Sequence, residues 1–515
     1  MKHLAYLLAL APLVALSAAP DRVKVQSGTL EGTTSEDASV RIFKGVPFAA
    51  PPVGDLRWKA PQPVPHWKGV RKADDWGPRC IQGLVFADII QREKSQGEDC
   101  LYLNIWAPAK SAKNSKKKLP VFVWYHGGGF AAGSGSEPRY DGAYLAKQGI
   151  VVVDVNYRLG IFGFFSHPEL TRESPHKASG NYGMLDQVEA LKWVKANIAG
   201  FGGDPNSVTI GGESAGSFSV SALMASPLSR GLIHKAIGES GAFAAGRSST
   251  LAELPLAASE QVGVTFAKAI GASDLAALRA MSAEKILAQA SQPNGGRFSP
   301  NIDGYFFPTP ASEIYAKGQQ ARIPLLAGWN SSEIGMAVAM NPVKPTPVTF
   351  QSQLAMVFKD KVEAAKKAYP AATNEEAEVA AAALASDQFI VYGTWKWIEE
   401  QARTKSPVYR FQFDRVLLEP NGSNRYGAAH AVEIEYAFNT LESKKAAWQP
   451  EDRQTAQTMS AYWANFIKTG NPNGHGLPTW PEFGKTHQVM HLDAVSKAQP
   501  EQHRDRYELM DSMAK

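Results

Sequence analysis

A serine between glycines is the clearest chemical feature of this 515-residue sequence. Ser214 lies in the motif G-E-S-A-G at 212–216, between a short apolar run at 208–210 and a segment with helical spacing of apolar residues. A serine on a tight turn from strand to helix presents its hydroxyl to a base, and the glycines leave room for the turn. The five-residue pattern alone is weakly specific. Its context predicts a nucleophile for covalent catalysis at Ser214.

Backbone amides are the second requirement of acyl transfer, because negative charge develops on the carbonyl oxygen in the transition state. The amide of Ala215 begins the helix after Ser214 and therefore lacks an intrahelical acceptor. Three glycines at 127–129 follow another apolar run, at 121–125, and allow further N–H groups to approach a substrate closely. We expect the oxyanion to be held by amides from these two places.

The glycine run has a competing interpretation. Residues 127–132 satisfy G-x-G-x-x-A, and Asp154 ends the next predicted strand, as in a dinucleotide-binding fingerprint. That fingerprint requires a helix that begins at the glycines, whereas the sequence G-S-G-S-E-P at 133–138 breaks a helix. The sequence therefore favours an oxyanion site over a nucleotide site.

A catalytic serine needs a histidine as base and a carboxylate that orients the histidine. Glu333 follows a strand predicted at 324–327, and His430 follows a strand predicted at 408–413. The order serine, acid, histidine is the order in α/β-hydrolases. Spacing alone leaves other candidates open, which are His475, His487, His491 and His503 for the base and Asp303, Glu313 and Asp360 for the acid.

The elements that must position these residues alternate along the chain. Strands covered on both faces are predicted by apolar runs at 121–125, 150–155, 208–210, 236–238, 324–327 and 408–413. Apolar residues recur with helical spacing from 183 to 198 and again after Ser214, which predicts a helix in each place. An alanine-rich stretch at 375–385 predicts a surface helix. This alternation predicts a large, mostly parallel α/β sheet flanked by helices, with ligands at the carboxyl ends of its strands.

The N-terminus has the features of a secretory signal. A lysine at position 2 precedes an apolar run at 4–16, and small residues follow at 17–19. The run is shorter than the roughly 20 residues that span a bilayer, and no later stretch is long and apolar enough. We expect a signal peptide at 1–19, cleaved after about residue 17–19, then a single domain at 20–515. The protein is expected to be secreted or periplasmic, without a stable membrane anchor.

Charge and cysteine content restrict the function further. A net charge of +5 without a clustered basic surface argues against a nucleic-acid partner, and the lysine-rich stretch 110–118 predicts a solvated loop.

Cys80 and Cys100 are the two cysteines, and in an oxidising compartment they can close one loop with a stabilisation of about 3 kcal/mol. The sequence has neither a CxxC pair nor HExxH, and strand-like residues separate His487 from His491, so neither a metal nor another cofactor is expected.

Two longer signatures carry a family resemblance. One runs from F-G-G-D at 201–204 to G-E-S-A-G at 212–216, and the other is E-D-C-L-Y-L-N-I-W-A-P at 98–108. Shorter matches extend from G-V-P-F-A at 45–49 to T-G-N-P at 469–472. The chain resembles the type-B carboxylesterases, the carboxylesterase and cholinesterase-like group of α/β-hydrolases, over nearly its whole length.

This resemblance implies an α/β-hydrolase fold and a serine carboxylesterase that hydrolyses small-molecule carboxylic esters through an acyl-enzyme. The implied site residues are Ser214 as nucleophile, Glu333 as acid, His430 as base, and Gly128, Gly129 and Ala215 as the oxyanion hole. The resemblance also implies a disulfide between Cys80 and Cys100.

Two comparisons within that group bear on the substrate and on the alternative function. Cholinesterases carry a tryptophan for the choline ammonium between the two cysteines. Here residues 81–99 contain no Trp or Tyr, only Phe86, so acetylcholine is not the expected substrate. Adhesion relatives lack the nucleophile, whereas Ser214 is present, so a binding protein with an idle triad is the alternative that the sequence disfavours. No motif predicts an oligomeric state.

Overall fold

The computed structural model describes residues 21–109, 118–248, 251, 253–334, 341–417 and 426–513. The predicted signal peptide and most of the lysine-rich stretch, residues 110–117, lie outside the described residues. Within them no helix is long and apolar enough to cross a membrane.

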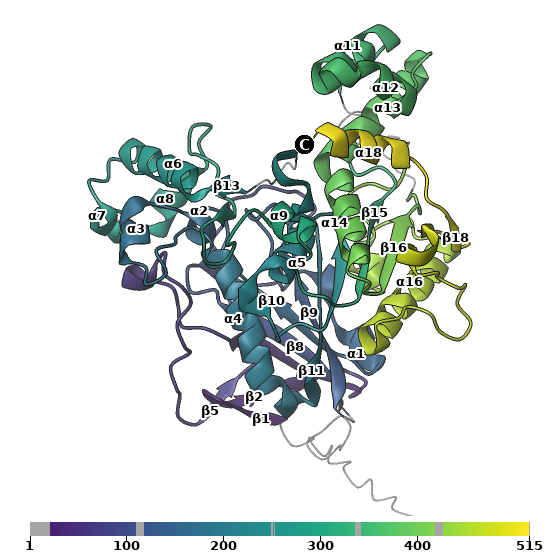
Figure 1. Cartoon of the computed structure of the whole chain (residues 1–515). Coiled ribbons are helices and arrows are strands. Elements are labelled where there is room, and N and C mark those ends of the chain that lie inside the picture. The colour runs from purple at the N-terminus through teal and green to yellow at the C-terminus, as the bar shows by residue number, and fades with distance from the viewer. Residues whose placement is uncertain are drawn as a thin grey trace, which may run out of the picture.

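A twisted central sheet organises the fold (Figure 1). Its parallel strands are β9 (Leu119–Tyr125), β10 (Val151–Val155), β11 (Gly203–Glu213), β12 (Lys235–Glu239), β15 (Leu325–Asn330), β16 (Val408–Phe413) and β17 (Gln488–Leu492). Antiparallel edges are added by β3 (Thr33–Thr34), β4 (Val40–Pro47), β8 (Tyr102–Pro108) and β18 (Lys497–Pro500). In the described residues the order is β18-β17-β16-β15-β12-β11-β9-β10-β8-β4-β3. The predicted large, mostly parallel α/β sheet is confirmed.

Smaller sheets lie outside the central one. They consist of β1 (Arg22–Val25), β2 (Gly28–Glu31) and β5 (Val70–Lys72), of β6 (Arg79–Cys80) with β7 (Gln96–Gly97), and of β13 (Leu254–Pro255) with β14 (Asn301–Ile302). A disulfide joins Cys80 at the end of β6 to Cys100, with an S–S distance of 2.02 Å. It closes the loop that contains Phe86.

Helices cover both faces of the sheet. They are α1 (Ala143–Lys147), α2 (Gly160–Phe164), α3 (Pro168–Glu173), α4 (Tyr182–Asn197), α5 (Ala215–Ala225), α6 (Leu256–Ala269), α7 (Leu275–Ala280), α8 (Ala283–Ala290), α9 (Ala311–Ala316), α11 (Pro347–Phe358), α12 (Val362–Ala368), α13 (Asn374–Ser386), α14 (Tyr392–Arg403), α15 (Ile434–Ala437), α16 (Pro450–Thr469), α17 (Phe483–Thr486) and α18 (Arg504–Met513).

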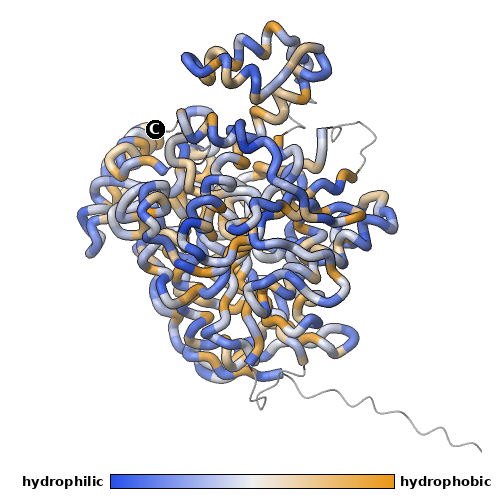
Figure 2. The backbone as a smooth tube through the Cα atoms, turned by 45° about the vertical axis from the view of Figure 1, so that its right-hand side comes forward, coloured by the Kyte–Doolittle hydropathy of each residue, from blue (hydrophilic) through white to orange (hydrophobic). Residues whose placement is uncertain are grey.

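Alternation along β9 shows how the two apolar layers arise. Val121, Val123 and Tyr125 join the core with α4, α5 and α14, whereas Phe122 and Trp124 join the core with α1 and α16. Successive side chains of a strand point to opposite faces, so a strand covered on both sides must be apolar throughout. Figure 2 accordingly shows hydrophobic segments running through the middle of the molecule.

A projecting lobe is formed by α11, α12 and α13 (Figure 1). The sequence predicted a surface helix at 375–385, and α13 is indeed a helix, begun by a capping box at Thr373. The helix is exposed on one side only, because Ala377, Ala381 and Leu384 are buried along the other. Small alanines allow this side to pack closely against its neighbours.

Candidate active site

Ser214 forms the turn between β11 and α5. Its φ of 52° and ψ of −121° are strained for a residue with a side chain. The turn is held at both ends, because the Ser214 N–H donates to the Glu239 carbonyl at 2.8 Å and the Ser214 carbonyl accepts from the Phe218 N–H at 2.9 Å. The serine is therefore fixed at the carboxyl end of a central strand, as its motif predicted.

The two glycines of the motif are required by close backbone packing. A Cβ on Gly212 would lie 2.4 Å from the carbonyl carbon of Gly216, and a Cβ on Gly216 would lie 1.9 Å from the Tyr125 carbonyl oxygen. Both distances are shorter than atomic contact permits. The turn can form only with glycine at these positions.

The 127–129 loop lies beside the serine. A Cβ on Gly127 would be 3.3 Å from the Ser214 Cβ. Gly128 and Gly129 have φ of 98° and 63°, and a Cβ on Gly128 would lie 2.1 Å from the Ala132 carbonyl oxygen. Within the described residues, the N–H groups of Gly128, Gly129 and Ala215 donate no hydrogen bond. These amides are available to an oxyanion.

The dinucleotide interpretation lacks its helix. Residues 126–137 form turns and irregular backbone, and the next element is a short 3-10 turn at Pro138–Tyr140. No helix N-terminus is therefore present at the glycines to receive a pyrophosphate.

His430 and Glu333 meet although they come from different loops. The Nδ1 of His430 lies 2.7 Å from Oε2 of Glu333. The other oxygen of Glu333 accepts two hydrogen bonds, from the Ser240 hydroxyl at 2.5 Å and from the Asn330 N–H at 2.7 Å. Glu333 is only 3% exposed, so these bonds fix its carboxylate. The carboxylate in turn anchors Nδ1 and selects the tautomer of the imidazole.

The second nitrogen of His430 faces the residue before the serine. Its Nε2 lies 3.2 Å from Oε1 of Glu213. In the described part of the chain the Ser214 hydroxyl makes no hydrogen bond to His430. The imidazole thus adjoins the serine turn while its Nε2 is aimed at a carboxylate. Hydrogen bonds of this kind commonly tighten or form only when substrate is bound.

Charges at the site are strongly coupled. Burial raises the pKa of Glu213 to about 7. Burial alone would lower the pKa of His430, but the charge of Glu213 and the hydrogen bond to Glu333 outweigh it and raise the pKa to about 9. Burial likewise raises the pKa of Glu239 to about 8 and that of Glu433 well above its usual range. Two carboxylates therefore favour the charged imidazole, whereas a base must be neutral.

The remaining histidine and acid candidates lie elsewhere in the fold. His491 pairs with Asp414 at 2.6 Å, and Glu313 pairs with Lys317 at 2.9 Å. The other candidates, His475, His487, His503, Asp303 and Asp360, form no contact with Ser214 or His430 among the described residues. Of all the pairs left open by spacing, Glu333 and His430 are the pair that the structure brings together.

Sequence reasoning missed the residues that support this pair. Ser240 and Asn330 hold Glu333, and Asn330 also donates through Nδ2 to Glu433 at 2.5 Å. Ser240 directly follows β12 and Asn330 ends β15, so both lie at the sheet edge where ligands collect. Polar residues at the ends of predicted strands were a usable signal for them.

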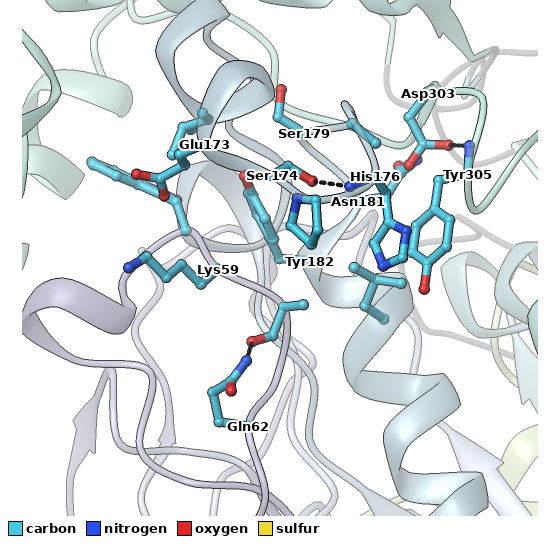
Figure 3. A pocket seen from close by; sticks show the side chains of 16 residues that line it. Lys59, Gln62, Glu173, Ser174, His176, Ser179, Asn181, Tyr182, Asp303 and Tyr305 are labelled. Carbon is cyan, nitrogen blue, oxygen red and sulfur yellow. Dashed lines mark hydrogen bonds between the residues drawn. The ribbon is translucent and has the colours of Figure 1, made fainter.

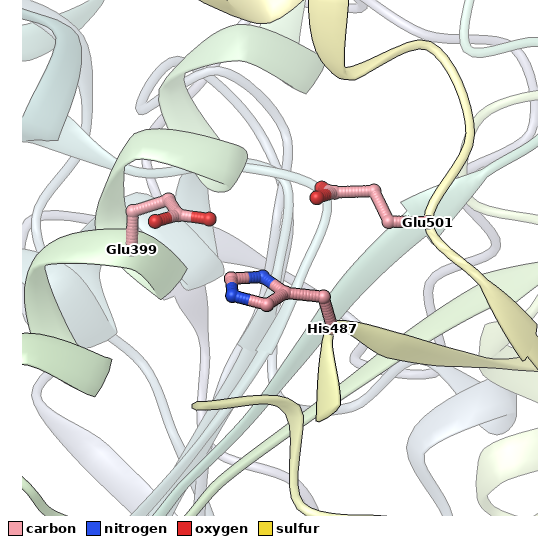
Figure 4. Close-up of side chains that lie close together, drawn as sticks. All are labelled: Glu399, His487 and Glu501. Atoms are coloured by element: carbon pink, nitrogen blue, oxygen red, sulfur yellow. The ribbon is translucent and has the colours of Figure 1, made fainter. Parts of the chain in front are cut away.

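One cluster has atoms spaced like metal ligands. In Glu399, His487 and Glu501 the nearest ligand atoms lie within 4.8 Å of one another (Figure 4). Nη1 of Arg504 donates to Glu399 at 2.8 Å and to Glu501 at 2.6 Å, and lies 3.5 Å from Nδ1 of His487. A guanidinium thus already supplies the positive charge among these groups. The segment 488–492 is strand β17, as its residues predicted.

Comparison with known proteins identifies the family. The model of the carboxylesterase family matches residues 19–510. A fumonisin B1 esterase of Sphingopyxis macrogoltabida is 37% identical over 496 residues, covering 93% of this chain and 88% of that protein. A para-nitrobenzyl esterase of Bacillus subtilis is 35% identical, covering 92% of this chain and 94% of that protein.

Solved structures show the same fold. A PNB esterase structure superposes with a TM-score of 0.81 at 33% identity, covering 95% of this chain and 99% of that one. A carboxylesterase of Geobacillus stearothermophilus gives a TM-score of 0.79 at 32% identity, covering 94% and 99%. The predicted α/β-hydrolase fold is confirmed. The chain belongs to the carboxylesterase family and is a carboxylic ester hydrolase.

Proposed function

We propose that the chain hydrolyses carboxylic esters of small molecules through a serine acyl-enzyme. Ser214 is the nucleophile, His430 the base and then the acid, and Glu333 the carboxylate that orients His430. The observation that carries this proposal is the 2.7 Å hydrogen bond between His430 and Glu333, with Nε2 turned toward the residue that precedes Ser214. A serine hydrolase needs a carboxylate on one ring nitrogen of the histidine and the serine hydroxyl on the other. The first of these contacts supports the proposal, and the second requires Nε2 to move from Glu213 to Ser214.

The first half-reaction acylates the serine. His430 in its neutral form takes the proton of the Ser214 hydroxyl as Oγ bonds to the ester carbonyl carbon. The carbonyl π electrons move onto oxygen, and the N–H groups of Gly128, Gly129 and Ala215 donate hydrogen bonds to this oxyanion, each contributing about 3 kcal/mol in the transition state. The oxyanion electrons then re-form the C=O bond, the ester C–O bond breaks, and the alcohol leaves with the proton held by His430.

The second half-reaction releases the acid. Water gives a proton to His430 and attacks the acyl carbon, and the C–O bond to Ser214 breaks as the serine recovers its proton. For either step Nε2 must turn from Glu213 toward Ser214. Transfer of one proton onto Glu213 removes the charge that holds Nε2 there, and its pKa of about 7 makes that transfer accessible near neutral pH.

Turnover by variants tests the nucleophile. Ser214→Ala should abolish hydrolysis of a p-nitrophenyl ester, because no other hydroxyl occupies the turn. Ser217→Ala is a matched control, since Ser217 lies one turn further along α5 and its hydroxyl donates to the Gly241 carbonyl at 2.6 Å. Equal loss in both variants, or turnover persisting in Ser214→Ala, would refute the assignment.

We further propose export. The signal-like segment 1–19 would be removed after about residue 17–19, which leaves a single domain, 20–515, in the periplasm or the medium. The Cys80–Cys100 disulfide supports an oxidising compartment. N-terminal sequencing of protein recovered outside the cytoplasm tests this: a first residue between 18 and 20 is expected, and an intact Met1 would contradict it.

A further inference from the structure

Figure 3 shows a cavity of about 410 Å³ that is lined by other residues than those of the serine turn. Its walls come from three segments, 58–62, 170–185 and 303–305, and none of the proposed catalytic or oxyanion residues lines it. Pockets for small molecules measure about 300–1,000 Å³. The cavity is therefore large enough for a compact ligand and is separate from ester hydrolysis.

The base of the cavity is apolar and aromatic. Trp58, Leu170 and Tyr182 line it and are 1%, 1% and 6% exposed. The indole N–H of Trp58 donates to the Ile161 carbonyl at 2.9 Å, so the polar atom of this buried side chain is satisfied. Such a base favours a flat apolar group over a strongly hydrated one.

One wall is a stacked pair of rings. His176 precedes α4 and Tyr305 follows β14, and their ring centroids are 3.7 Å apart with planes inclined by only 7° (Figure 3). Asp303 fixes the turn that carries Tyr305, because its Oδ1 accepts the N–H groups of Tyr305, Phe306 and Phe307 at 2.8–3.0 Å. An aromatic ring of a ligand can pack against this rigid wall, whose edges are polar.

Of the charged side chains that line the cavity, the one without a partner in the described part of the chain is a cation. Glu173 is held by Arg279 through two hydrogen bonds, of 2.9 and 2.5 Å, and Asp303 is engaged by the backbone amides of its turn. Lys59 also lines the cavity, and its ammonium forms no hydrogen bond or salt bridge within the described residues, although it lies in the field of Glu173. The two carboxylates are thus occupied and the ammonium can receive an anion.

We propose that this cavity binds a small aromatic carboxylate. The ring lies against the His176–Tyr305 pair, with the apolar base beneath it, and the carboxylate meets Lys59. The proposal does not depend on Ser214 being the nucleophile, because the cavity contains none of the residues assigned to ester hydrolysis.

Calorimetric titration of the full-length protein with 2-naphthoate and with the neutral 2-naphthamide tests this ligand class. Lys59→Gln should weaken naphthoate binding about fivefold, as expected for a partly exposed ion pair, and leave naphthamide binding unchanged. Lys68→Gln, at an exposed position outside the cavity, is the matched control and should change neither. Equal affinity for the two ligands, or no binding at millimolar concentration, would overturn the proposal.

Two further variants locate the ligand. His176→Ala, at an exposed loop position that should tolerate the change, removes half of the stacked wall and should weaken both ligands. Ser214→Ala should leave both affinities unchanged. If His176→Ala had no effect, or if Ser214→Ala weakened naphthoate, the ligand would not occupy this cavity. Neither outcome depends on whether Ser214→Ala still hydrolyses esters.

Discussion

Replacing Glu213 with glutamine removes the negative charge that faces the base. Oε1 of Glu213 lies 3.2 Å from Nε2 of His430, which is the nitrogen that must reach Ser214. The substitution keeps the size of a side chain that is 1% exposed. It therefore separates the effect of charge from the effect of packing.

The size of the effect follows from the geometry. Two unit charges 3.2 Å apart attract with about 5 kcal/mol at an effective dielectric constant of about 20. Glu213 is itself partly protonated near neutral pH, since burial raises its pKa to about 7, and the His430 side chain is 25% exposed. We therefore expect about 1–3 kcal/mol of the attraction to be realised, which corresponds to about one to two units in the pKa of His430.

The direction in which the pKa of His430 changes can be read from the pH dependence of kcat/KM. His430 must be neutral to act as base, and Glu213 raises its pKa, so Glu213→Gln should move the rising limb to lower pH by about one to two units. Glu239→Gln is the control, because Glu239 is buried on the next strand but bonds to Trp463 at 2.8 Å instead of to His430. A limb that stays in place in Glu213→Gln, or moves to higher pH, would show that the charge of Glu213 does not raise the pKa of His430.

Three further predictions concern the acid, the disulfide and a buried ion pair. Glu333→Gln should lower kcat for a p-nitrophenyl ester about 10³–10⁴-fold with an unchanged melting temperature, because the 2.7 Å bond that sets the tautomer is lost; a decrease below tenfold would contradict this role. Replacing both Cys80 and Cys100 by serine should lower the free energy of unfolding in urea by about 3 kcal/mol, and wild-type stability would count against it. Asp186→Asn should cost about 3–5 kcal/mol in the same assay, since it leaves the guanidinium of Arg158, bonded to Asp186 at 2.8 and 2.7 Å, buried without its counter-charge; a cost under 1 kcal/mol would show that water reaches the site.

The positions of strands could be predicted from the sequence where a continuous run of apolar residues forms a strand that is covered on both faces. The run 408–413 was predicted with the bounds of β16, because both faces of this strand are covered. β11 is longer than its predicted 208–210, since it begins at Gly203 with polar residues that lie beyond the covered centre of the sheet. Hydrophobicity marks the apolar part of a strand. It misses hydrogen-bonded ends that reach solvent and also a buried end such as 211–213, which consists of glycine and glutamate.

Site residues followed from the sequence when a motif or a strand end constrained them. The turn at Ser214 requires its two glycines for close packing, so the motif carried real structural information. The approach of Glu213 to His430 could not be read in this way, because the middle positions of G-x-S-x-G accept many residues. Only the assembled fold shows that a carboxylate at 213 faces the imidazole and changes its charge.

Activation of Ser214 by His430 is the central step of the proposed reaction, and covalent labelling measures the reactivity of the Ser214 hydroxyl directly. An organophosphonate should add one group per chain, located at Ser214 by peptide mass spectrometry, and His430→Ala should slow the labelling at least a hundredfold by removing the base. Labelling of another residue, or labelling of Ser214 at the same rate in His430→Ala, would contradict the account.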